Sequence, residues 1–531
     1  MTRTNKAIGT FYTICTILLL NGCTKKFKEY NTNSTGLSDK QIAVDYQNLG
    51  EPMQQAQLYI MSNTNWIYQL QQNLIGDVYS GYMMSADPFN SNTNNTNYFL
   101  MDGWNFYPWD YAYNNVMKAT QNVLNATTDP KYASFRAWAK IVRVEAMHRV
   151  SDIYGPIIYT NYGKSNPDGS VTYDSQKDAY YAFFNDLDSS ISILTTLVQS
   201  GAPETFSKFD LVYGGSFQEW LKFANSLRLR LAIRISNIDP AKAKTEGEAA
   251  LANIGGLLSI NDDNAFVNIG TNTHPVNSIS KSWGDINTGA PLACYLNGYN
   301  DPREAKYILK ATDAVVAGQY IGIRNGINID AIGRYGGYSL PVDFSNKMQI
   351  MVAAEAWFLK AEAAVKGWAG AGDAKTDYET GIKTSFAQYG LDASSYINDD
   401  THTEQPYMDP KCITPGENNV LTGSPYLSTI TIKWDAAASP ARQLERIITQ
   451  KWLALYPDGQ EAWSEFRRTG YPILFPVVIN KSGGTISTTK FVQRINFPSD
   501  ERSTNPSGVA GATQALGGPD NGGTPLWWAK P

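Results

Sequence analysis

The chain has 531 residues, of which 44 are Lys or Arg, 49 are Asp or Glu and only three are His. Its formal net charge is −5 and it has no basic stripe, so nucleic acid is excluded as an expected partner. Only 18% of the residues are charged, whereas 12% are aromatic. A polar, weakly charged and aromatic-rich composition is typical of extracellular proteins that handle carbohydrates.

The first 22 residues are predicted to be a cleaved signal peptide (1–22). A short basic start precedes an apolar run over residues 7–20, which is shorter than the ~20 residues that a membrane-spanning helix needs. The run ends in Leu20-Asn21-Gly22-Cys23, which resembles a bacterial lipobox. We therefore expect Cys23 to be lipidated, with two or three acyl chains that hold the protein firmly to a membrane. The alternative is an ordinary secretory signal that carries a chance cysteine.

Residues 23–45 are polar and without periodicity, so they are predicted to form a lipidated flexible tether ahead of a single folded domain over residues 46–531. Surface-exported lipoproteins often carry acidic residues just after the lipidated cysteine, whereas this chain has a lysine-rich stretch there. The face of the membrane on which it is displayed therefore stays open. Cys294 and Cys412 either form one disulfide or remain two free thiols.

Apolar residues recur at helical spacing in three segments, 136–153, 175–197 and 216–235. Ser175 and Ser216 each precede an acidic residue by three positions, which is the spacing of a capping box. The Ala-rich stretch 346–366 predicts a further helix, and a partner helix follows between residues 373 and 390. The last helical region is predicted at 441–468.

Helices of this length, joined by short Gly-containing turns, favour a mainly α fold on a TPR-like scaffold, although no strict 34-residue repeat is present. Long polar stretches separate the helices, and stretches of this length are usually functional or packed over the scaffold. A few short strands are expected in them, for example at 320–324 and 429–434, where apolar and polar residues alternate. The long polar stretches lie at residues 86–103, 161–174, 255–345, 391–440 and 477–531.

Several segments resemble the SusD/RagB family. Residues 137–159 are similar to the family segment that ends in D-x-Y-G-x-(I/V)-P-Y, although Pro156 here follows Gly155 directly. The order of these motifs along residues 50–531 makes the resemblance specific, whereas each motif alone is only moderately so. The other matching segments are 173–188, 223–235, 301–303, 355–367, 450–472 and the C-terminal stretch from 494 to 528.

The resemblance implies a single SusD-like helical domain of four TPR-like units, with loop-rich insertions that form the ligand face. It also implies a cell-surface lipoprotein of the outer membrane that captures a nutrient, most often an oligosaccharide. Its expected partner is a SusC-like TonB-dependent transporter, over which it acts as a lid. The same architecture binding peptides or another nutrient is the alternative function.

Motifs of enzymes are missing from the sequence. It contains no G-x-S-x-G, no H-E-x-x-H and no C-x-x-C, so we expect no enzyme activity, no cofactor and no catalytic metal. A surface glycosidase remains the weaker alternative, because it needs only two carboxylates at about 5–10 Å. A structural calcium ion near residues 262–264 is conceivable, but no loop there has EF-hand spacing.

Aromatic stacking is the chemistry that remains, because the C–H groups on the apolar face of a sugar pack on an aromatic ring. The window 66–109 is rich in aromatic residues interleaved with Asn, and it provides the first candidates. Five tryptophans at helical positions are expected in the core instead, and Trp527 and Trp528 are expected to fasten the C-terminal tail. The candidate ligand-binding residues are Trp66, Tyr79, Tyr82, Trp104, Trp109, Trp283, Tyr299 and Trp434.

Overall fold

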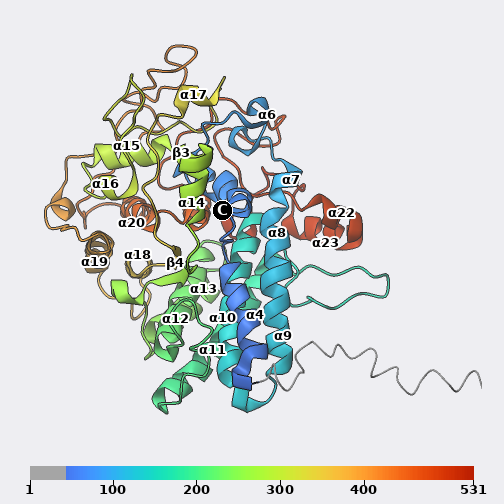
Figure 1. The fold of residues 1–531 in the computed structure, drawn as a ribbon. Helices are drawn as coiled ribbons and strands as arrows, with labels where there is room; N and C mark the ends of the chain where they lie inside the picture. The colour runs from blue at the N-terminus through green and yellow to red at the C-terminus, as the bar shows by residue number, and fades with distance from the viewer. Residues whose placement is uncertain (1–43, 531) are drawn as a thin grey trace, which may run out of the picture. The chain divides into compact units, whose positions relative to one another are not determined.

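Helices dominate the computed structural model, which describes residues 44–530 (Figure 1). The predicted signal peptide, Cys23 and all but the last two residues of the predicted tether lie outside these described residues. Within the described chain, residues 49–530 form one compact unit by their contacts. Among residues 44–530, no helix combines the length and the hydropathy that crossing a membrane would require.

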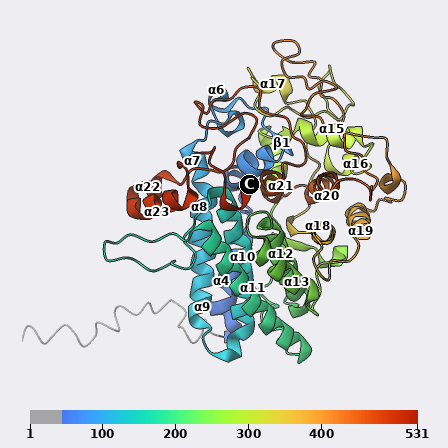
Figure 2. The ribbon, with the colours of Figure 1, turned by 180° about the vertical axis from the view of Figure 1, so that it is seen from behind.

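Four helices stand side by side, and each contacts the next in sequence (Figures 1 and 2). The first three confirm the predicted helices at 136–153, 175–197 and 216–235. The hydroxyls of Ser175 and Ser216 accept hydrogen bonds from the backbone N–H of Asp178 and Glu219, as their spacing predicted. The four are α10 (Ala133–Tyr154), α11 (Gln176–Gln199), α12 (Phe217–Arg234) and α13 (Pro240–Ala252).

A second group comprises α18 (Ala353–Val365), α19 (Ala374–Ala387), α20 (Pro440–Leu455) and α21 (Gly459–Thr469). The prediction of one helix over 346–366 is wrong at its start. Residues Lys347–Met351 form strand β4, which pairs antiparallel with β2 (Ala265–Asn268). Cross-strand pairing satisfies the backbone of this less Ala-rich stretch, so the helix begins only where the alanine run does.

Only two further strands occur in the described chain, β1 (Met83–Met84) and β3 (Asn287–Thr288), which pair with each other. The expected strands at 320–324 and 429–434 are not formed. Of these residues, Ile323 makes a single isolated bridge to Gly289. Both segments are instead part of the long polar stretches, which commonly pack over a scaffold as loops.

Most of the remaining helices are short, and the longest of them are α4 near the N-terminus and α23 near the C-terminus. The long polar stretch at 477–531 contains two helices that the sequence did not predict, α22 and α23. These elements are α4 (Gln47–Leu58), α5 (Asn65–Tyr68), α6 (Phe89–Asn92), α7 (Asp102–Asn105), α8 (Tyr107–Tyr111), α9 (Lys118–Ala126), α14 (Pro275–Asn277), α15 (Ala290–Gly298), α16 (Glu304–Tyr307), α17 (Ile332–Tyr335), α22 (Ser499–Thr504) and α23 (Pro506–Leu516). The π-helical turns are η2 (Gln69–Asp77), η4 (Ala112–Met117) and η7 (Ser278–Trp283), and the 3-10 turns are η1 (Val44–Tyr46), η3 (Asn95–Asn97), η5 (Pro130–Tyr132), η6 (Asn261–Asp263), η8 (Tyr396–Asn398) and η9 (Trp527–Ala529).

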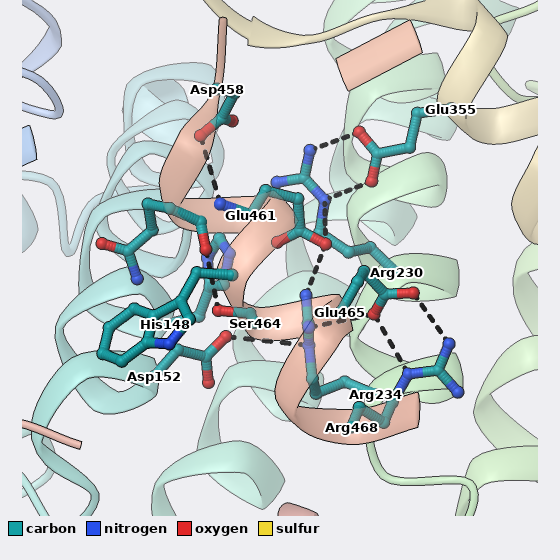
Figure 3. A network of polar contacts seen from close by, with 12 residues as sticks. His148, Asp152, Arg230, Arg234, Glu355, Asp458, Glu461, Ser464, Glu465 and Arg468 are labelled. Carbon is teal, nitrogen blue, oxygen red and sulfur yellow. Dashed lines mark hydrogen bonds and ion pairs between the residues drawn. The ribbon is translucent and has the colours of Figure 1, made fainter. Parts of the chain in front are cut away.

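A buried network of charged side chains joins the two groups of helices (Figure 3). Arg230 of α12 makes a bidentate ion pair with Glu355 of α18, at 2.7 and 2.8 Å, and both side chains are fully buried. Arg234 of α12 binds Glu461 and Glu465 of α21. Charged hydrogen bonds of this kind compensate the cost of burial only while every partner is present, so the network fixes how these helices pack.

Burial also perturbs the titration of the groups in this network. Glu461 is buried within α21, and burial raises its pKa to about 7 despite the neighbouring arginines. His148 is also fully buried, and burial lowers its pKa well below the usual value. His148, Asp152 and Glu461 lie close enough to hold a metal ion, but the guanidinium of Arg234 already lies beside both carboxylates.

Candidate ligand-binding surface

The continuous helical segment from α7 through α8 to η4 carries aromatic residues on more than one side. Pro108 stands in the first turn of α8, where a proline costs no hydrogen bond and favours the helix start. Tyr107 and Tyr111 lie one helical turn apart, and their rings stack at 5.9 Å between centroids. The end of the predicted aromatic window, from residue 102 onward, is therefore helical rather than a loop.

Trp66 of α5 packs edge-on against this helix. Its ring lies 5.3 Å from that of Tyr107 and 6.5 Å from that of Tyr111, at nearly perpendicular angles, and Tyr59 stacks on Tyr111 at 5.7 Å. Although it is held by these contacts, the Trp66 side chain remains 46% exposed. We refer to Tyr59, Trp66, Tyr107 and Tyr111 as the Trp66 patch. A large, ordered and exposed indole of this kind is a preformed platform for an apolar ligand face.

Trp283, at the end of η7, is the second exposed candidate, with 41% of its surface accessible. Helix α5 contacts η7 directly, so Trp66 and Trp283 lie on neighbouring elements. Polar groups accompany them, because the amide of Gln69 donates to Asp285 at 2.8 Å. Asp87 also faces this region, and its pKa is raised first by burial and then by repulsion from Asp285.

Trp104 and Trp434 are both half-buried. Trp104 of α7 packs edge-on against Phe89 of α6, with 5.5 Å between the ring centroids. Trp434 packs on Tyr378 of α19, with 5.3 Å between the ring centroids. Ligand contact by Trp66, Trp104, Trp283 and Trp434 stays a prediction.

Four candidates are largely covered by the protein, and ligand contact by them also stays a prediction. Tyr82 and Tyr299 are at most 2% exposed, and their hydroxyls donate to the carbonyls of Trp452 and Ile430. Tyr79 is 8% exposed and donates to a backbone carbonyl of the Asn-rich loop. Trp109 is 4% exposed. These rings fill the core because long-range packing brings other aromatic residues onto them.

Trp109 nevertheless lines a cleft of about 380 Å³ on the far side of the α8 helix from the Trp66 patch. Phe106, Tyr113 and Tyr162 contribute further aromatic walls to the cleft. Carboxylates complete it, since Asp110 shares it with Asp500 and Glu501 of α22. Burial and the nearby Asp500 raise the pKa of Asp110. No local sequence pattern predicts this cleft, because α22 lies far from the aromatic window along the chain.

Most of the helical tryptophans pack in the core as predicted. Trp138, Trp220, Trp452 and Trp463 are at most 1% exposed. Trp357 is only half-buried, and its indole donates to the carbonyl of Ser259. Trp528 is fully buried and donates to Asp152 at 2.9 Å, so it does fasten the C-terminal tail. Cys294 and Cys412 are both free thiols.

The region that suggested calcium is occupied by protein donors. The carboxylate of Asp263 forms an ion pair with Lys222 at 2.7 Å. It also accepts hydrogen bonds from the backbone N–H groups of Ser259 and Ile260. These donors lower the pKa of Asp263 although it is partly buried. A carboxylate so satisfied has little reason to recruit a cation.

Comparisons with known proteins place this geometry in a family. The family model for SusD-like proteins, described as the SusD and RagB outer membrane lipoproteins, matches residues 29–529. A chitin-binding SusD homologue from Flavobacterium johnsoniae is 42% identical, with a TM-score of 0.86 over 91% of this chain and 98% of that chain. A SusD homologue from Bacteroides vulgatus is 36% identical, with a TM-score of 0.84 over 92% of this chain and 99% of that chain. A comparison with curated proteins finds no match. The chain therefore belongs to the SusD-like family of outer membrane lipoproteins.

Proposed function

We propose that this lipoprotein captures a glycan at the cell surface through the Trp66 patch and Trp283, and delivers it to a SusC-like TonB-dependent transporter in the outer membrane. The observation that carries the proposal is the exposed indole of Trp66, held edge-on by two tyrosines. The ring face of a sugar presents C–H groups that pack on such an indole, while Gln69 and Asp285 beside Trp283 supply hydrogen-bonding groups.

A glycan is favoured over other nutrients because one relative with the same fold, 42% identical to this chain, is described as chitin-binding. Peptides remain the alternative ligand class, since an aromatic platform also binds apolar side chains. A binding role without turnover agrees with the absence of catalytic motifs from the sequence. Glycosidase activity would require two carboxylates flanking one bound sugar bond.

The first experiment is an array of glycans and peptides probed with the protein lacking residues 1–23, followed by calorimetry on each hit. Saturable binding of an oligosaccharide with no release of reducing ends supports the capture function. Binding of peptides alone would replace the glycan in the proposal. Accumulation of shorter glycans would overturn the non-enzymatic part of it.

The site is tested with Trp66→Ala and Trp283→Ala, each measured against Trp357→Ala as a matched control. Trp357 is a half-buried tryptophan outside the proposed surface, so its loss should leave affinity unchanged. Losing one stacking ring costs roughly 1–2 kcal/mol, which corresponds to about tenfold weaker binding. Unchanged affinity in both variants, with the fold intact, would show that the glycan binds elsewhere.

The transporter contact is proposed to use the side of the scaffold formed by α10 to α13, because a lid needs a large docking surface. A photo-crosslinking amino acid at the exposed position of Lys177, on α11, should capture the transporter in intact cells. The same probe at exposed Lys433, beside Trp434, serves as the control. Equal capture from both positions would remove this surface from the proposal.

A further inference from the structure

A cavity of about 490 Å³ opens beside the C-terminal end of α21. Four segments wall it together with α21: the loop that follows the helix, residues 425–426, the stretch around residue 490 and the C-terminal tail. Its size lies within the range of small-molecule sites. We refer to it as the Arg467 cavity, because the guanidinium of Arg467 forms part of its wall.

Arg467 is a buried cation whose hydrogen-bond partners are all neutral. Only 7% of its surface is exposed. Its Nε donates to the carbonyl of Trp463, one Nη donates to the carbonyl of Gln493 at 3.0 Å, and the other donates to Ser464 Oγ at 3.0 Å. Because a guanidinium has five N–H groups, one N–H on each Nη is left over, which matches the two oxygens of a carboxylate.

Burial dominates the electrostatics of this guanidinium. It lowers the pKa of Arg467 below its usual value, although Asp152 and Glu461 raise it from a longer distance. Neighbouring Arg468, in contrast, is bridged by the carboxylates of Glu362 and Glu465, each at 2.7 Å. A desolvated cation without a contacting anion is stabilised when an anion binds beside it.

The rest of the wall is apolar and rigid. Phe491 packs edge-on against Phe466, with 4.9 Å between ring centroids. The backbone of Phe491 has a φ of 60°, a conformation that a bulky residue keeps only where its surroundings impose it. Ile473 and Tyr426 extend the apolar lining, and the exposed Lys490 adds a second positive charge at the cavity.

We propose that the Arg467 cavity binds a small carboxylate with an aromatic or aliphatic body, whose oxygens pair with Arg467 and Lys490 while its apolar part packs against the wall formed by Phe466 and Phe491. This site is separate from the proposed glycan surface and does not depend on it. The apolar lining disfavours inorganic anions, which would gain the charge contact but leave the walls unfilled.

The probes are 3-phenylpropionate and octanoate, each compared by calorimetry with its neutral amide on the whole mature protein. Saturable binding of an acid, with the matched amide at least tenfold weaker, is the expected result. Equal binding of acid and amide, or no saturable binding of either acid at millimolar concentration, would overturn the proposal. Phosphate alone binding as tightly as the acids would also overturn it, because the apolar walls would then contribute nothing.

Variants locate the binding. Lys490→Gln should weaken binding of the acids about three- to fivefold, and Phe491→Ala should weaken it about tenfold. Lys481→Gln, which removes a lysine outside the cavity, should leave the affinity for the acids unchanged. Arg467→Gln should abolish binding, and if that variant does not fold, the Lys490 and Phe491 variants decide the outcome. Trp66→Ala should leave binding of the acids intact, so failure of this site and failure of the glycan surface are distinguishable.

Discussion

The ion pair between Arg230 and Glu355 offers a direct test of the buried network. Replacing Arg230 by Met removes the guanidinium but keeps a side chain of similar length, and it leaves Glu355 buried without its bidentate partner. Breaking a buried pair in this way costs about 3–5 kcal/mol, because Glu355 stays desolvated and keeps only Lys451, at 3.7 Å, as a charged partner. Arg230 also contacts Glu145 and Glu461, so the upper part of this range is expected.

This cost translates into a modest shift of the unfolding temperature. A folded unit of this size has an unfolding entropy of about 1 kcal/mol/K at its midpoint, so Arg230→Met should lower Tm by roughly 3–5 °C. The assay is calorimetry at a fixed scan rate. The double variant Arg230→Met/Glu355→Met removes both charges, and it should recover at least half of the loss.

An exposed pair provides the control for the same assay. Lys433 and Asp400 lie 2.8 Å apart, but their side chains are 49% and 59% exposed. Because water and salt screen such pairs, Lys433→Met should shift Tm by less than about 1 °C. The reasoning would be refuted if Arg230→Met/Glu355→Met were as destabilised as the sum of Arg230→Met and Glu355→Met measured separately. That result would mean that the two charges act independently.

Three further predictions concern packing, pH and thiols. Gly76→Ala should lower Tm by about 1–3 °C, because its Cβ would lie 2.7 Å from the α21 backbone, whereas Gly103→Ala, which meets nothing within 4 Å, should not. Burial raises the pKa of Asp77 to about 7, so its contribution to stability is lost as pH rises from about 4 to 7. Calorimetry should show wild-type Tm falling by about 2–3 °C relative to Asp77→Asn between pH 5 and pH 8, and a parallel pH profile for the two proteins would contradict this. Mass spectrometry after labelling with iodoacetamide should find Cys412 modified and buried Cys294 protected, and no label on either would indicate a disulfide.

The helices were predictable where the signal is local. The stripe in 136–153 and the caps at Ser175 and Ser216 depend on neighbours within four residues, and the structure confirms them. Strand β4 was missed because its partner β2 lies about eighty residues earlier in the chain, and only that pairing makes Lys347–Met351 extended. Helix propensity is a weak preference that such tertiary contacts override.

The buried network escaped prediction for a related reason. Charged residues are usually exposed, and nothing in the local sequence distinguishes Glu461 and Glu465 from surface residues. Their partners come from α12 and α20, and nothing in the local sequence marks them. The aromatic window shows the same limit of local sequence patterns. Trp66 and Tyr82 both lie in this window of aromatic and Asn residues, but the Trp66 side chain is exposed whereas that of Tyr82 is buried.

Two consecutive arginines on α21 illustrate how one helix serves both structure and binding. Successive residues point about 100° apart around a helix, so Arg467 and Arg468 face different surroundings. Arg468 turns into the network, where Glu362 and Glu465 neutralise it, and its role is to fix α21 against α18. Arg467 turns toward the C-terminal tail, where it lies over the rings of Trp463 and Trp528 but contacts no carboxylate. Aromatic faces hold a guanidinium in place without neutralising it, which leaves its charge available to an anion in the adjoining cavity.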